Sequence, residues 1–468
     1  MTVQNKYFSR REALRSAGAG FGMLAFAGLS GSSAPLHAAP AESKAVDLWA
    51  PKPPHFAPKA KSVIFLFLRG GLSQVDTFDP KPMLDKYDGK PLPYDAPRTE
   101  FTTGNLMRSP FSFKRYGQSG AAVSEIFPHI AGVIDDFCLV RSMITDIPNH
   151  GPAITQTYTG AIRPGRPSMG SWVIYGLGTE NQNLPGFLSL AQGASEAGTT
   201  AGFLPATYQG TAIPINEVDP RKQIQYLSNL KLKPDQQQRQ LDLWKDLAKN
   251  YMNQFQTSPE LEATIHSMEV AFRMQTEAPE ILDIRKESPA TLASYGEGNF
   301  ARGCIMARRM VERGVRFVQL YHGNWDHHTD IMGHKVLARE VDQPIAALVE
   351  DLKSRGLLDQ TLVVVGSEFG RTPVLDIGSF RALANGRDHN PYGYTTLLAG
   401  GGVKAGMTYG STDDFGFKAV ENPVHVHDLH ATMLHVLGLN HERLTYRYSG
   451  RDFRLTDVAG NVVKEILA

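Results

Sequence analysis

The sequence predicts an α/β fold built around one mainly parallel β-sheet. Three observations predict it: β-branched apolar runs suited to buried strands, helical patterns between these runs, and glycines where several runs end. Parallel strands that helices cover on both faces are apolar along their whole length. Alternating strands and helices are typical of doubly wound sheets, whose ligands bind beyond the carboxyl ends of the strands. We therefore expect polar residues that follow the strands to form a site.

The amino-terminal residues predict an export signal rather than part of the fold. Arg10 and Arg11 precede a mildly apolar stretch, residues 17–29, and residues 39–41 offer a small-x-small cleavage pattern. This order is typical of twin-arginine signal peptides. An apolar core of about 15 residues is shorter than the roughly 20 that a membrane-spanning helix needs. We expect residues 1–41 to engage the twin-arginine export machinery and to be removed in the periplasm or outside the cell.

The expected mature chain, residues 42–468, is long enough for one large α/β domain without a stable membrane span. Its charge argues against nucleic acid as a partner, because 48 basic and 47 acidic residues give the whole chain a net charge of +1. Cys138 and Cys304 lie in apolar runs and predict neither a disulfide framework nor a thiolate metal site. Twin-arginine export carries proteins that are already folded, commonly with a cofactor inserted, which favours a bound metal.

The first half of the chain predicts two strands of the central sheet. Residues 62–68 form an uninterrupted apolar run that ends in glycines, and Asp76 falls in the loop at its carboxyl end. Residues 137–141 predict the second strand. A loop through His150 follows this strand, and residues 151–160 then show a helical pattern.

Residues 232–285 predict a helical insertion. Glycine disappears from this segment, while Gln, Glu, Lys and Leu dominate it. Apolar side chains recur there at helical spacing, at Leu241, Trp244, Leu247, Ala248 and Tyr251. The pattern leaves two roles open: helices that pack onto the sheet, or a lid over the site.

The second half of the chain alternates predicted helices and strands. The helices cover residues 299–313, 335–355 and 428–437, and the strands cover residues 315–321, 361–365 and 393–399. This alternation is the doubly wound pattern.

Acidic and histidine residues follow several of the predicted strands. Asp76, Asp326, His328, Glu368 and His389 all fall in segments after apolar runs. A single Asp or His in a loop is more often structural, but strands of one sheet can bring several such residues to one edge. Carboxylates and neutral imidazoles suit zinc, manganese or a related ion. The sequence therefore predicts that these five residues bind divalent metal ions.

Residues beside these candidates have open roles. Arg371 either pairs with the preceding candidate glutamate or holds an anionic substrate through bidentate hydrogen bonds. Asp388 can orient a ligating imidazole instead of binding an ion directly. Arg387 is a second candidate for holding the anion, and Asn149 and His327 are candidates for supporting the ligands or the substrate.

Five motifs together resemble the signature set of the DUF1501 family. They are Gly70–Ser73 with Asp76–Lys81, Trp325–His328, Glu368–Pro373, Gly386–His389 and Ala399–Gly402. This family of exported bacterial proteins is similar to the alkaline phosphatase and sulfatase superfamily. The resemblance implies an alkaline-phosphatase-like three-layer sandwich, with helices on both faces of the sheet and two divalent ions at the strand ends.

The same resemblance assigns the candidate ligands to two sites. Asp326, His328 and His389 resemble the ligands of one ion. Asp76 and Glu368 would bridge to the second ion or complete its site.

Two positions depart from the superfamily pattern. Phe369 stands where the superfamily usually has a ligating histidine, and a phenylalanine cannot bind an ion. His150 stands where the superfamily has its Ser, Thr or modified Cys nucleophile. Because a histidine can act as a nucleophile, as an acid or base, or as an extra ligand, His150 is a catalytic candidate with these roles open.

We expect an exported, metal-dependent hydrolase of phosphate or sulfate esters, acting on an anionic small molecule or polysaccharide ester. Zinc is the first expectation for the ion, with manganese, magnesium or calcium as alternatives. Arg371 or Arg387 would hold the anion. The rival expectation is an exported binding or assembly protein that kept the fold and lost the chemistry together with the hydroxyl nucleophile.

Overall fold

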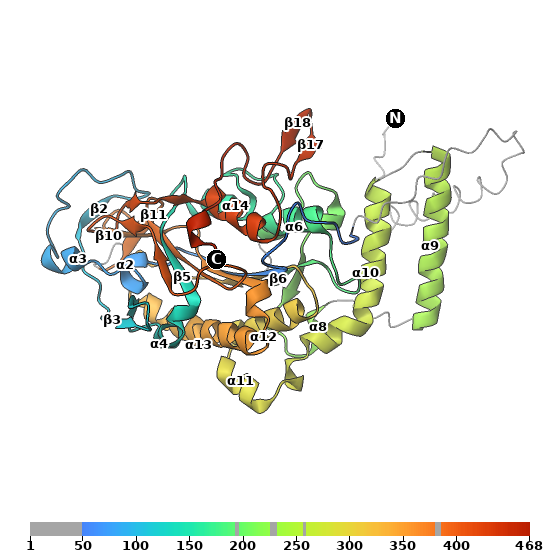
Figure 1. Ribbon diagram of the computed structural model, residues 1–468, viewed down its shortest axis with the longest axis horizontal. Helices are drawn as coiled ribbons and strands as arrows, with labels where there is room; N and C mark the ends of the chain where they lie inside the picture. The colour runs from blue at the N-terminus through green and yellow to red at the C-terminus, as the bar shows by residue number, and fades with distance from the viewer. Residues whose placement is uncertain (1–48, 192–195, 225–231, 256–258, 380–384) are drawn as a thin grey trace, which may run out of the picture. The chain divides into compact units, whose positions relative to one another are not determined.

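The computed structural model describes residues 49–468 except 192–195, 225–231, 256–258 and 380–384. The predicted signal peptide lies outside the described residues. The described part is built on a nine-stranded sheet (Figure 1). In spatial order its strands are β13 (Met407–Tyr409), β5 (Phe137–Ile144), β12 (Tyr394–Ala399), β9 (Thr361–Gly366), β1 (Ser62–Leu68), β8 (Phe317–His322), β6 (Phe187–Ala191) and β7 (Thr211–Pro214), and β16 (Val424–His425) also pairs with β5.

Strand β12 runs against the rest of this sheet. It is antiparallel to β9 on one side and to β5 on the other. The remaining pairs in the sheet are parallel, from β7 through β6, β8 and β1 to β9, and from β5 to β13 and β16. The start of β12 therefore lies at the edge where its neighbours end. The mainly parallel sheet that the sequence predicted is confirmed.

Helices cover both faces of the sheet, because alternate strand residues point into two separate cores. On β1, Ile64, Leu66 and Leu68 contribute to one core and Val63, Phe65 and Phe67 to the other. The first core packs against α4 (Pro128–Gly132), α12 (Asn299–Glu312) and α13 (Gly333–Ser354). The second packs against α5 (His150–Thr159), α6 (Met169–Leu177) and α14 (Val426–Val436). The predicted three-layer arrangement is therefore present (Figure 1).

Smaller elements surround the carboxyl edge of the sheet and its flanks. A three-stranded antiparallel sheet has the order β11 (Arg387–Asn390), β10 (Gly370–Asp376) and β2 (Thr103–Leu106). Two-stranded ribbons join β3 (Phe113–Tyr116) to β4 (Ala121–Ser124), β14 (Ser411–Thr412) to β15 (Ala419–Glu421), and β17 (Tyr446–Tyr448) to β18 (Arg451–Phe453). The short helices are α2 (Gln74–Thr77), α3 (Pro82–Lys86), α7 (Glu196–Thr199), α8 (Pro220–Gln223) and α11 (Pro289–Tyr295).

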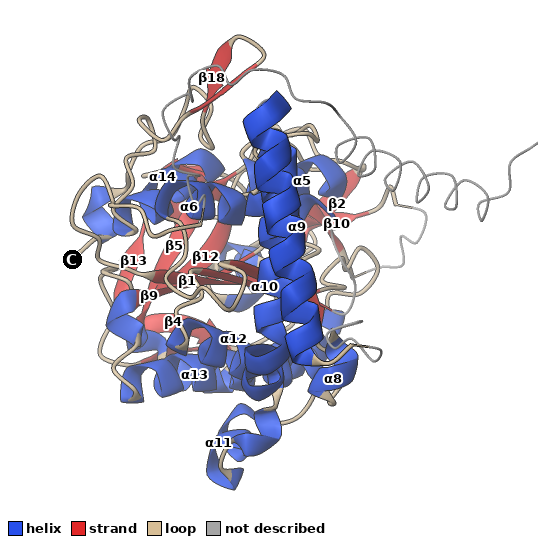
Figure 2. Ribbon diagram, turned by 90° about the vertical axis from the view of Figure 1, so that its right-hand side faces the viewer, coloured by secondary structure: helices blue, strands red, loops and turns tan. Residues whose placement is uncertain are grey.

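The helical insertion contains two long helices, α9 (Pro234–Phe255) and α10 (Pro259–Leu282), which lie side by side in Figure 1 and one in front of the other in Figure 2. Helix α10 packs into the first core through Val270, Met274, Ala278, Ile281 and Leu282. Helix α9 leaves much of its predicted apolar stripe exposed, at Trp244, Leu247 and Tyr251, while Ala248 is buried. The part of the insertion that packs onto the domain is therefore α10.

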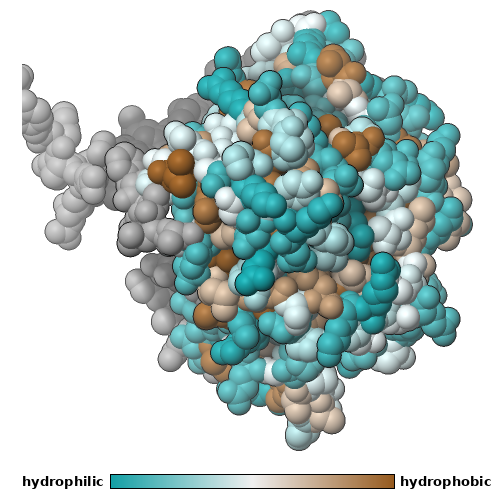
Figure 3. All heavy atoms as spheres, turned by 90° about the vertical axis from the view of Figure 1, so that its left-hand side faces the viewer, coloured by the Kyte–Doolittle hydropathy of each residue, from teal (hydrophilic) through white to brown (hydrophobic). Residues whose placement is uncertain are grey.

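Two features concern the prediction that the mature chain has no stable membrane span: the polarity of the surface and the length and polarity of the helices. Figure 3 shows one face of the molecule, on which hydrophilic residues dominate and hydrophobic ones occur in small separate groups. Within the described ranges, every helix is too short or too polar to cross a membrane.

Candidate metal centre

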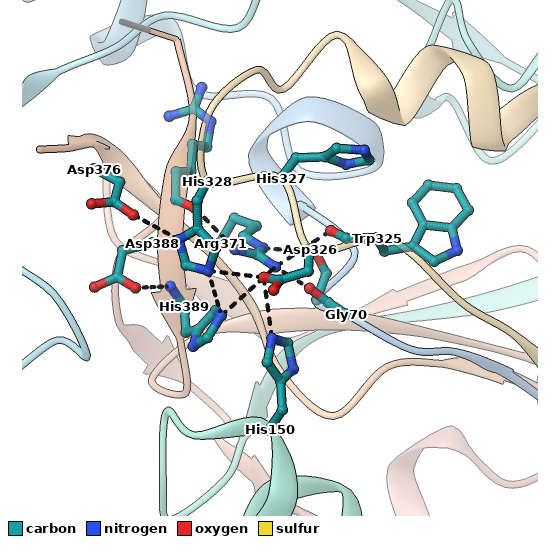
Figure 4. A network of polar contacts seen from close by, with 12 residues as sticks. Gly70, His150, Trp325, Asp326, His327, His328, Arg371, Asp376, Asp388 and His389 are labelled. Carbon is teal, nitrogen blue, oxygen red and sulfur yellow. Dashed lines mark hydrogen bonds and ion pairs between the residues drawn. The ribbon is translucent and has the colours of Figure 1, made fainter. Parts of the chain in front are cut away.

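Three imidazoles and one carboxylate converge on a single point at the carboxyl edge of the sheet (Figure 4). The Oδ1 atom of Asp326 lies 3.1 Å from Nε2 of His150, 2.9 Å from Nε2 of His328 and 3.1 Å from Nε2 of His389. The Nε2 atoms of His328 and His389 are 3.0 Å apart. We call these four residues the His-Asp cluster.

The fold brings the cluster together from three places in the sequence. Asp326 and His328 follow the end of β8, and His150 is the first residue of α5, beyond the end of β5. His389 lies on β11, just before β12 begins. Because β12 is antiparallel to its neighbours, its start lies at the same edge as their ends. A residue that precedes β12 thereby meets residues that follow β5 and β8.

Two further carboxylates hold the outer nitrogens of the cluster. Glu368 Oε1 lies 2.7 Å from Nδ1 of His150, and Asp376 Oδ2 lies 2.6 Å from Nδ1 of His328. An ionised carboxylate can only accept a hydrogen bond, so each Nδ1 carries a proton, and in the neutral ring each Nε2 then presents a lone pair to the centre. This carboxylate–histidine arrangement orients imidazoles that bind metal ions.

The donor atoms fit a tetrahedral zinc ion. Zinc–nitrogen bonds of about 2.0–2.1 Å place the ligand atoms of a tetrahedral site about 3.3 Å apart. The four donor atoms lie within 4.8 Å of one another, and the separations given above are close to that tetrahedral edge. Nε2 of His150 is buried and makes no hydrogen bond, although it faces Asp326. A cation at the centre would satisfy it.

Burial and charge shift the pKa values of the cluster. Burial lowers the pKa of His389 to about 3, so this imidazole stays neutral and able to coordinate. Burial acts to raise the pKa of Asp326, but the three neighbouring imidazoles and the charge of Arg371 together lower it well below its usual value. For His150, burial acts to lower the pKa, and the nearby carboxylates of Asp326 and Glu368 outweigh it and raise the pKa overall.

An open cleft of ≈ 600 Å³ adjoins the cluster, and both His150 and Asp326 line it. The Asp326 side chain is 41% exposed, which makes the centre accessible from the cleft. The other lining residues are Arg69, Gly70, Ile215, Glu297, Gly298, Asn299, Phe300, Tyr321, His322, Gly323, Asn324, Leu337 and Glu340. Among the described residues, none that lines the cleft belongs to α9 or α10, so the insertion supplies no wall of it.

The family model for "Protein of unknown function (DUF1501)" matches residues 60–467. The chain belongs to the DUF1501 family. The resemblance carried by the sequence motifs is thereby confirmed over nearly the whole described part. No curated protein matches the chain.

Several solved structures are distantly similar to this DUF1501 protein. A sulfatase from Pseudoalteromonas sp., PsFucS1, is 14% identical with a TM-score of 0.35, over 81% of this chain and 68% of that one. The lipoteichoic acid synthase LtaP from Listeria monocytogenes is 9% identical with a TM-score of 0.34, over 87% and 79%. A TAB5 alkaline phosphatase mutant with Mg bound is 10% identical with a TM-score of 0.33, over 82% and 99%. These similarities are too weak to bear on the chemistry of the DUF1501 protein, which depends on its own side chains.

The structure does not bring Asp76 into the cluster. Asp76 lies in helix α2 rather than in a loop, and both of its oxygens accept from Arg387, at 2.7 Å from Nε and 3.1 Å from Nη2. Ser73 donates a third hydrogen bond to Asp76. Both members of this pair are fully buried. Arg387 therefore neutralises Asp76 inside the protein, and neither of them faces a ligand.

Arg371 also serves the interior rather than a substrate. Its guanidinium is fully buried and donates to the backbone oxygens of Gly70, Gly71 and Arg387. Its charged partner is Asp326, 2.5 Å from Nη2, rather than Glu368. The hydrogen bonds fix the carboxylate that the imidazoles approach. The contacts of Arg371 thus favour Asp326 over Glu368 as its partner, and full burial of its guanidinium argues against the anion-binding role.

Glu368 was predicted to bind an ion directly, but its carboxylate contacts the outer nitrogen of His150 instead of the centre of the cluster. Besides His150, its carboxylate accepts from the backbone N–H of Gly70, at 2.9 Å. Asp388 accepts from the backbone N–H groups of Phe101 and His389, both at 2.7 Å, rather than from an imidazole. Burial raises the pKa of Asp388 to about 6.

Two other predicted residues lie outside the cluster. Nδ1 of His327 is 2.8 Å from Nδ1 of the buried His334, and His334 in turn accepts from the backbone N–H of Ser73. Asn149 donates from its exposed amide to Glu100, at 3.1 Å. Neither contact involves a cluster residue.

Sequence reasoning missed one residue of the centre. Asp376, at the end of β10, supports His328 but stands apart from the acidic and histidine motifs. The signal available was its place at the end of the strand that starts beside Glu368. Phe369 is buried and stacks on His389 with ring centroids 4.5 Å apart, and it also contacts His150 at 4.9 Å. A phenylalanine at this position therefore packs against two imidazoles of the cluster.

Proposed function

We propose that this DUF1501 protein is a metal-dependent hydrolase of phosphate or sulfate esters. The observation that supports the proposal is the convergence of three imidazole Nε2 atoms and Asp326 Oδ1 at the wall of an open cleft. Catalytic zinc sites keep a position for water or substrate and can expand to five ligands, and this cluster adjoins the cleft through His150 and Asp326. The ester would be an anionic small molecule or a polysaccharide ester.

One divalent ion, zinc in the first instance, is the cofactor that the donors favour. Three imidazole nitrogens with one carboxylate oxygen are typical zinc ligands, while calcium and magnesium prefer all-oxygen sites. A second group of possible donors, His328, Asp376 and Asp388, shares His328 with the cluster. Because Asp376 holds the Nδ1 proton of that histidine, we assign the group to support of a single ion rather than to a second one.

The residues around the ion have separate tasks in the proposed reaction. A divalent ion supplies Lewis-acid polarisation of the ester and activation of water. Glu368 and Asp376 keep the Nδ1 protons of His150 and His328 in place, so that both imidazoles present lone pairs. Arg371 fixes Asp326 through a hydrogen bond from its buried guanidinium.

We propose water as the nucleophile instead of an enzyme hydroxyl. His150 begins α5, where the superfamily pattern has its hydroxyl nucleophile, and its imidazole faces the cluster. The nearest hydroxyls in sequence have other partners, since Thr145 donates to Gln156 Oε1 and Thr155 donates to the Gly151 carbonyl, both at 2.8 Å. Neither threonine lines the cleft.

Metal analysis and turnover together test this proposal. We expect about one zinc per chain after zinc loading, and hydrolysis of at least one ester in a panel of phosphomonoesters, phosphodiesters and sulfate esters. The His328→Ala variant should lose both the ion and the turnover. His129→Ala, which changes an exposed histidine outside the cluster, is the matched control. Turnover that persists in metal-free His328→Ala would refute the proposal.

The rival function is an exported binding or assembly protein. The observation that favours it is the imidazole of His150 at the position where the superfamily has its nucleophile. A zinc-loaded, folded protein that turns over none of the three ester classes would favour this rival.

We further propose export by the twin-arginine pathway to the periplasm or cell exterior. The support is the arrangement of Arg10 and Arg11 before the apolar residues 17–29. Mass spectrometry of the protein from the exported fraction should show a new amino terminus near Glu42. Replacing both arginines with lysine should retain the unprocessed chain in the cytoplasm, and unchanged export would contradict the proposal.

A further inference from the structure

Arg69 is the arginine of the site that faces the cleft. It follows β1, and its guanidinium lines the same cleft as His150 and Asp326. Nη1 of Arg69 donates to the Tyr321 hydroxyl at 2.7 Å, and the guanidinium lies 6.0 Å from the centre of the Tyr321 ring. Among the described residues, Arg69 forms no ion pair with a carboxylate. Its remaining N–H groups are therefore available to a ligand.

The backbone around Arg69 ties it to the metal centre. Its carbonyl oxygen accepts from the backbone N–H of Trp325 at 3.1 Å, one residue before Asp326. Its own N–H donates to the His322 carbonyl at 2.8 Å, and the next residue, Gly70, donates to Glu368. The position of Arg69 relative to the His-Asp cluster is thus fixed by hydrogen bonds on both sides.

The two arginines named by the sequence motifs differ from Arg69 in this respect. Arg371 and Arg387 are fully buried, and their guanidinium groups bond backbone oxygens and an internal carboxylate. Turning Arg387 toward an anion would leave the buried Asp76 unpaired, which is costly, and turning Arg371 away would release the Asp326 carboxylate that it fixes. Arg69 is exposed, and among the described residues it pairs with no carboxylate.

We propose that Arg69, positioned by Tyr321, binds the anionic group of the ester while that group faces the metal centre. This inference rests on the proposed function, because it takes the anion to be the phosphate or sulfate of the substrate. A planar guanidinium with free N–H groups matches the oxygens of such a group.

The rest of the cleft limits the other part of the substrate. Its lining includes the carboxylates of Glu297 and Glu340 and the amides of Asn299 and Asn324. Glu340 pairs with His322 at 3.1 Å and stays 57% exposed. Carboxylates would repel a second anion, whereas carboxylates and amides both accept hydrogen bonds from hydroxyl groups. The substrate class is therefore an ester with one anionic group on a neutral, hydroxyl-bearing alcohol.

Anion binding to the zinc-loaded protein tests the role of Arg69 without requiring turnover. Inorganic phosphate and sulfate are the probes, titrated by calorimetry. Arg69→Met should weaken the affinity by roughly 10- to 100-fold, as expected for a charged hydrogen bond. Tyr321→Phe removes only the hydroxyl that holds Arg69. This variant should weaken the anion affinity several-fold, which is less than the loss in Arg69→Met. Arg447→Met, at an exposed arginine of β17, is the matched control.

The outcomes separate this inference from the proposed function. Zinc content measured by mass spectrometry should stay unchanged in Arg69→Met, since Arg69 is no ligand. If wild type binds neither anion, or if both variants bind as wild type does, the role of Arg69 is refuted. Metal-dependent turnover in wild type would still support the hydrolase in that case.

The substrate class has a test of its own. Glycerol 3-phosphate carries a hydroxymethyl group at the position where 3-phosphoglycerate carries a carboxylate. We expect glycerol 3-phosphate to displace bound phosphate at a concentration at least about tenfold lower. The double variant Glu297→Gln, Glu340→Gln should reduce this preference. Equal displacement by the two compounds in wild type would overturn the assignment.

Discussion

At the scale of residues, one oxygen atom carries the strongest argument for a metal ion. Asp326 Oδ1 has four nitrogen neighbours within hydrogen-bonding distance, three imidazole Nε2 atoms and Arg371 Nη2. A carboxylate oxygen offers about two lone-pair sites. In the neutral state, at least two of those imidazoles present lone pairs rather than protons, because carboxylates hold their Nδ1 protons. A cation bound among these atoms would accept their lone pairs and so remove the repulsion between them.

Replacing Glu368 with Gln should weaken metal binding while leaving the fold intact. The variant removes the charge that fixes the Nδ1 proton of His150, and such outer partners typically change metal affinity by about 10- to 100-fold. Competition with a chromophoric chelator measures the zinc affinity. Asp376→Asn should have a similar effect through His328, whereas Glu312→Gln, on a partly exposed helix residue, is the control. Unchanged zinc affinity in both cluster variants would contradict the assignment of these carboxylates.

Substituting Gly70 with Ala should destabilise the site more than a comparable change elsewhere. Gly70 has φ +121°, and a Cβ there would lie 2.6 Å from the backbone nitrogen of Asp326. Gly89 also has a positive φ, +73°, but a Cβ there would meet nothing within 4 Å. Both alanine variants are strained in the backbone, so the added cost at Gly70, about 1–3 kcal/mol, is steric. Urea unfolding of the two variants measures the difference, and equal losses would show that no clash occurs.

His430 should make the fold less stable in mild acid. Burial, with the neighbouring His427 second, lowers its pKa from 6.5 to about 3. The unfolded chain therefore takes up a proton near pH 6.5, while the folded chain resists protonation down to about pH 3. The stability that the neutral ring contributes is present above pH 6.5 and decreases as the pH falls. The decrease amounts to about 2 kcal/mol between pH 6.5 and about pH 5.

Urea unfolding of metal-free wild type and His430→Leu at several pH values tests this dependence. The variant lacks the titrating ring, so its stability should fall less between pH 6.5 and about pH 5. Parallel curves for the two proteins would argue against a buried neutral His430.

At the scale of elements, the site depends on segments that converge on the carboxyl edge of the sheet. Helix α5 presents His150, the segment after β8 presents Asp326 and His328, and β11 presents His389. Strands β10 and β11 pair in antiparallel register with Arg371 opposite His389. This pairing places the arginine that fixes Asp326 beside one of the ligands.

The ion pair between Asp76 and Arg387 should behave as a structural link between α2 and β11. Asp76→Ala would leave a buried guanidinium without its partner, and breaking a buried pair from one side costs about 3–5 kcal/mol. Chemical denaturation measures the loss. Zinc content at saturating metal should stay near wild type under conditions where the variant is folded. Loss of zinc from a folded variant would return Asp76 to the list of ligands.

At the scale of the whole molecule, a bound ion would cross-link three distant parts of the chain. The ligands come from positions 150, 326, 328 and 389, so the ion cannot bind them together in the unfolded chain. Binding to the folded state alone stabilises it by about 4 kcal/mol when the free ion exceeds its Kd roughly a thousandfold.

Removing the metal should therefore lower the melting temperature, and adding zinc should restore it. Differential scanning calorimetry before and after treatment with a chelator measures the shift. His328→Ala should melt at one temperature with or without zinc. A zinc-induced shift of equal size in that variant would place the stabilising ion elsewhere.

The sequence by itself determined the layered architecture and most of the centre. An unbroken apolar run such as residues 62–68 has few alternatives to a buried parallel strand, and β1 has those bounds. Because such strands end at one edge, residues that follow them, such as Asp326 and His328, could be placed together before any geometry was known. The helical segment could likewise be recognised, because its composition changes so clearly.

Only the tertiary structure decided which charged residues meet. Asp76 and Arg387 are 311 positions apart, and their pairing inside the protein leaves no signal in either local motif. The reversed direction of β12 brought His389 to the edge, and the end of β10 brought Asp376 to His328. Side-chain partners depend on distances between segments, whereas strand and helix patterns depend on neighbours along the chain. For that reason the sequence determined the site's location, and the packing of the chain decided the role of each residue in it.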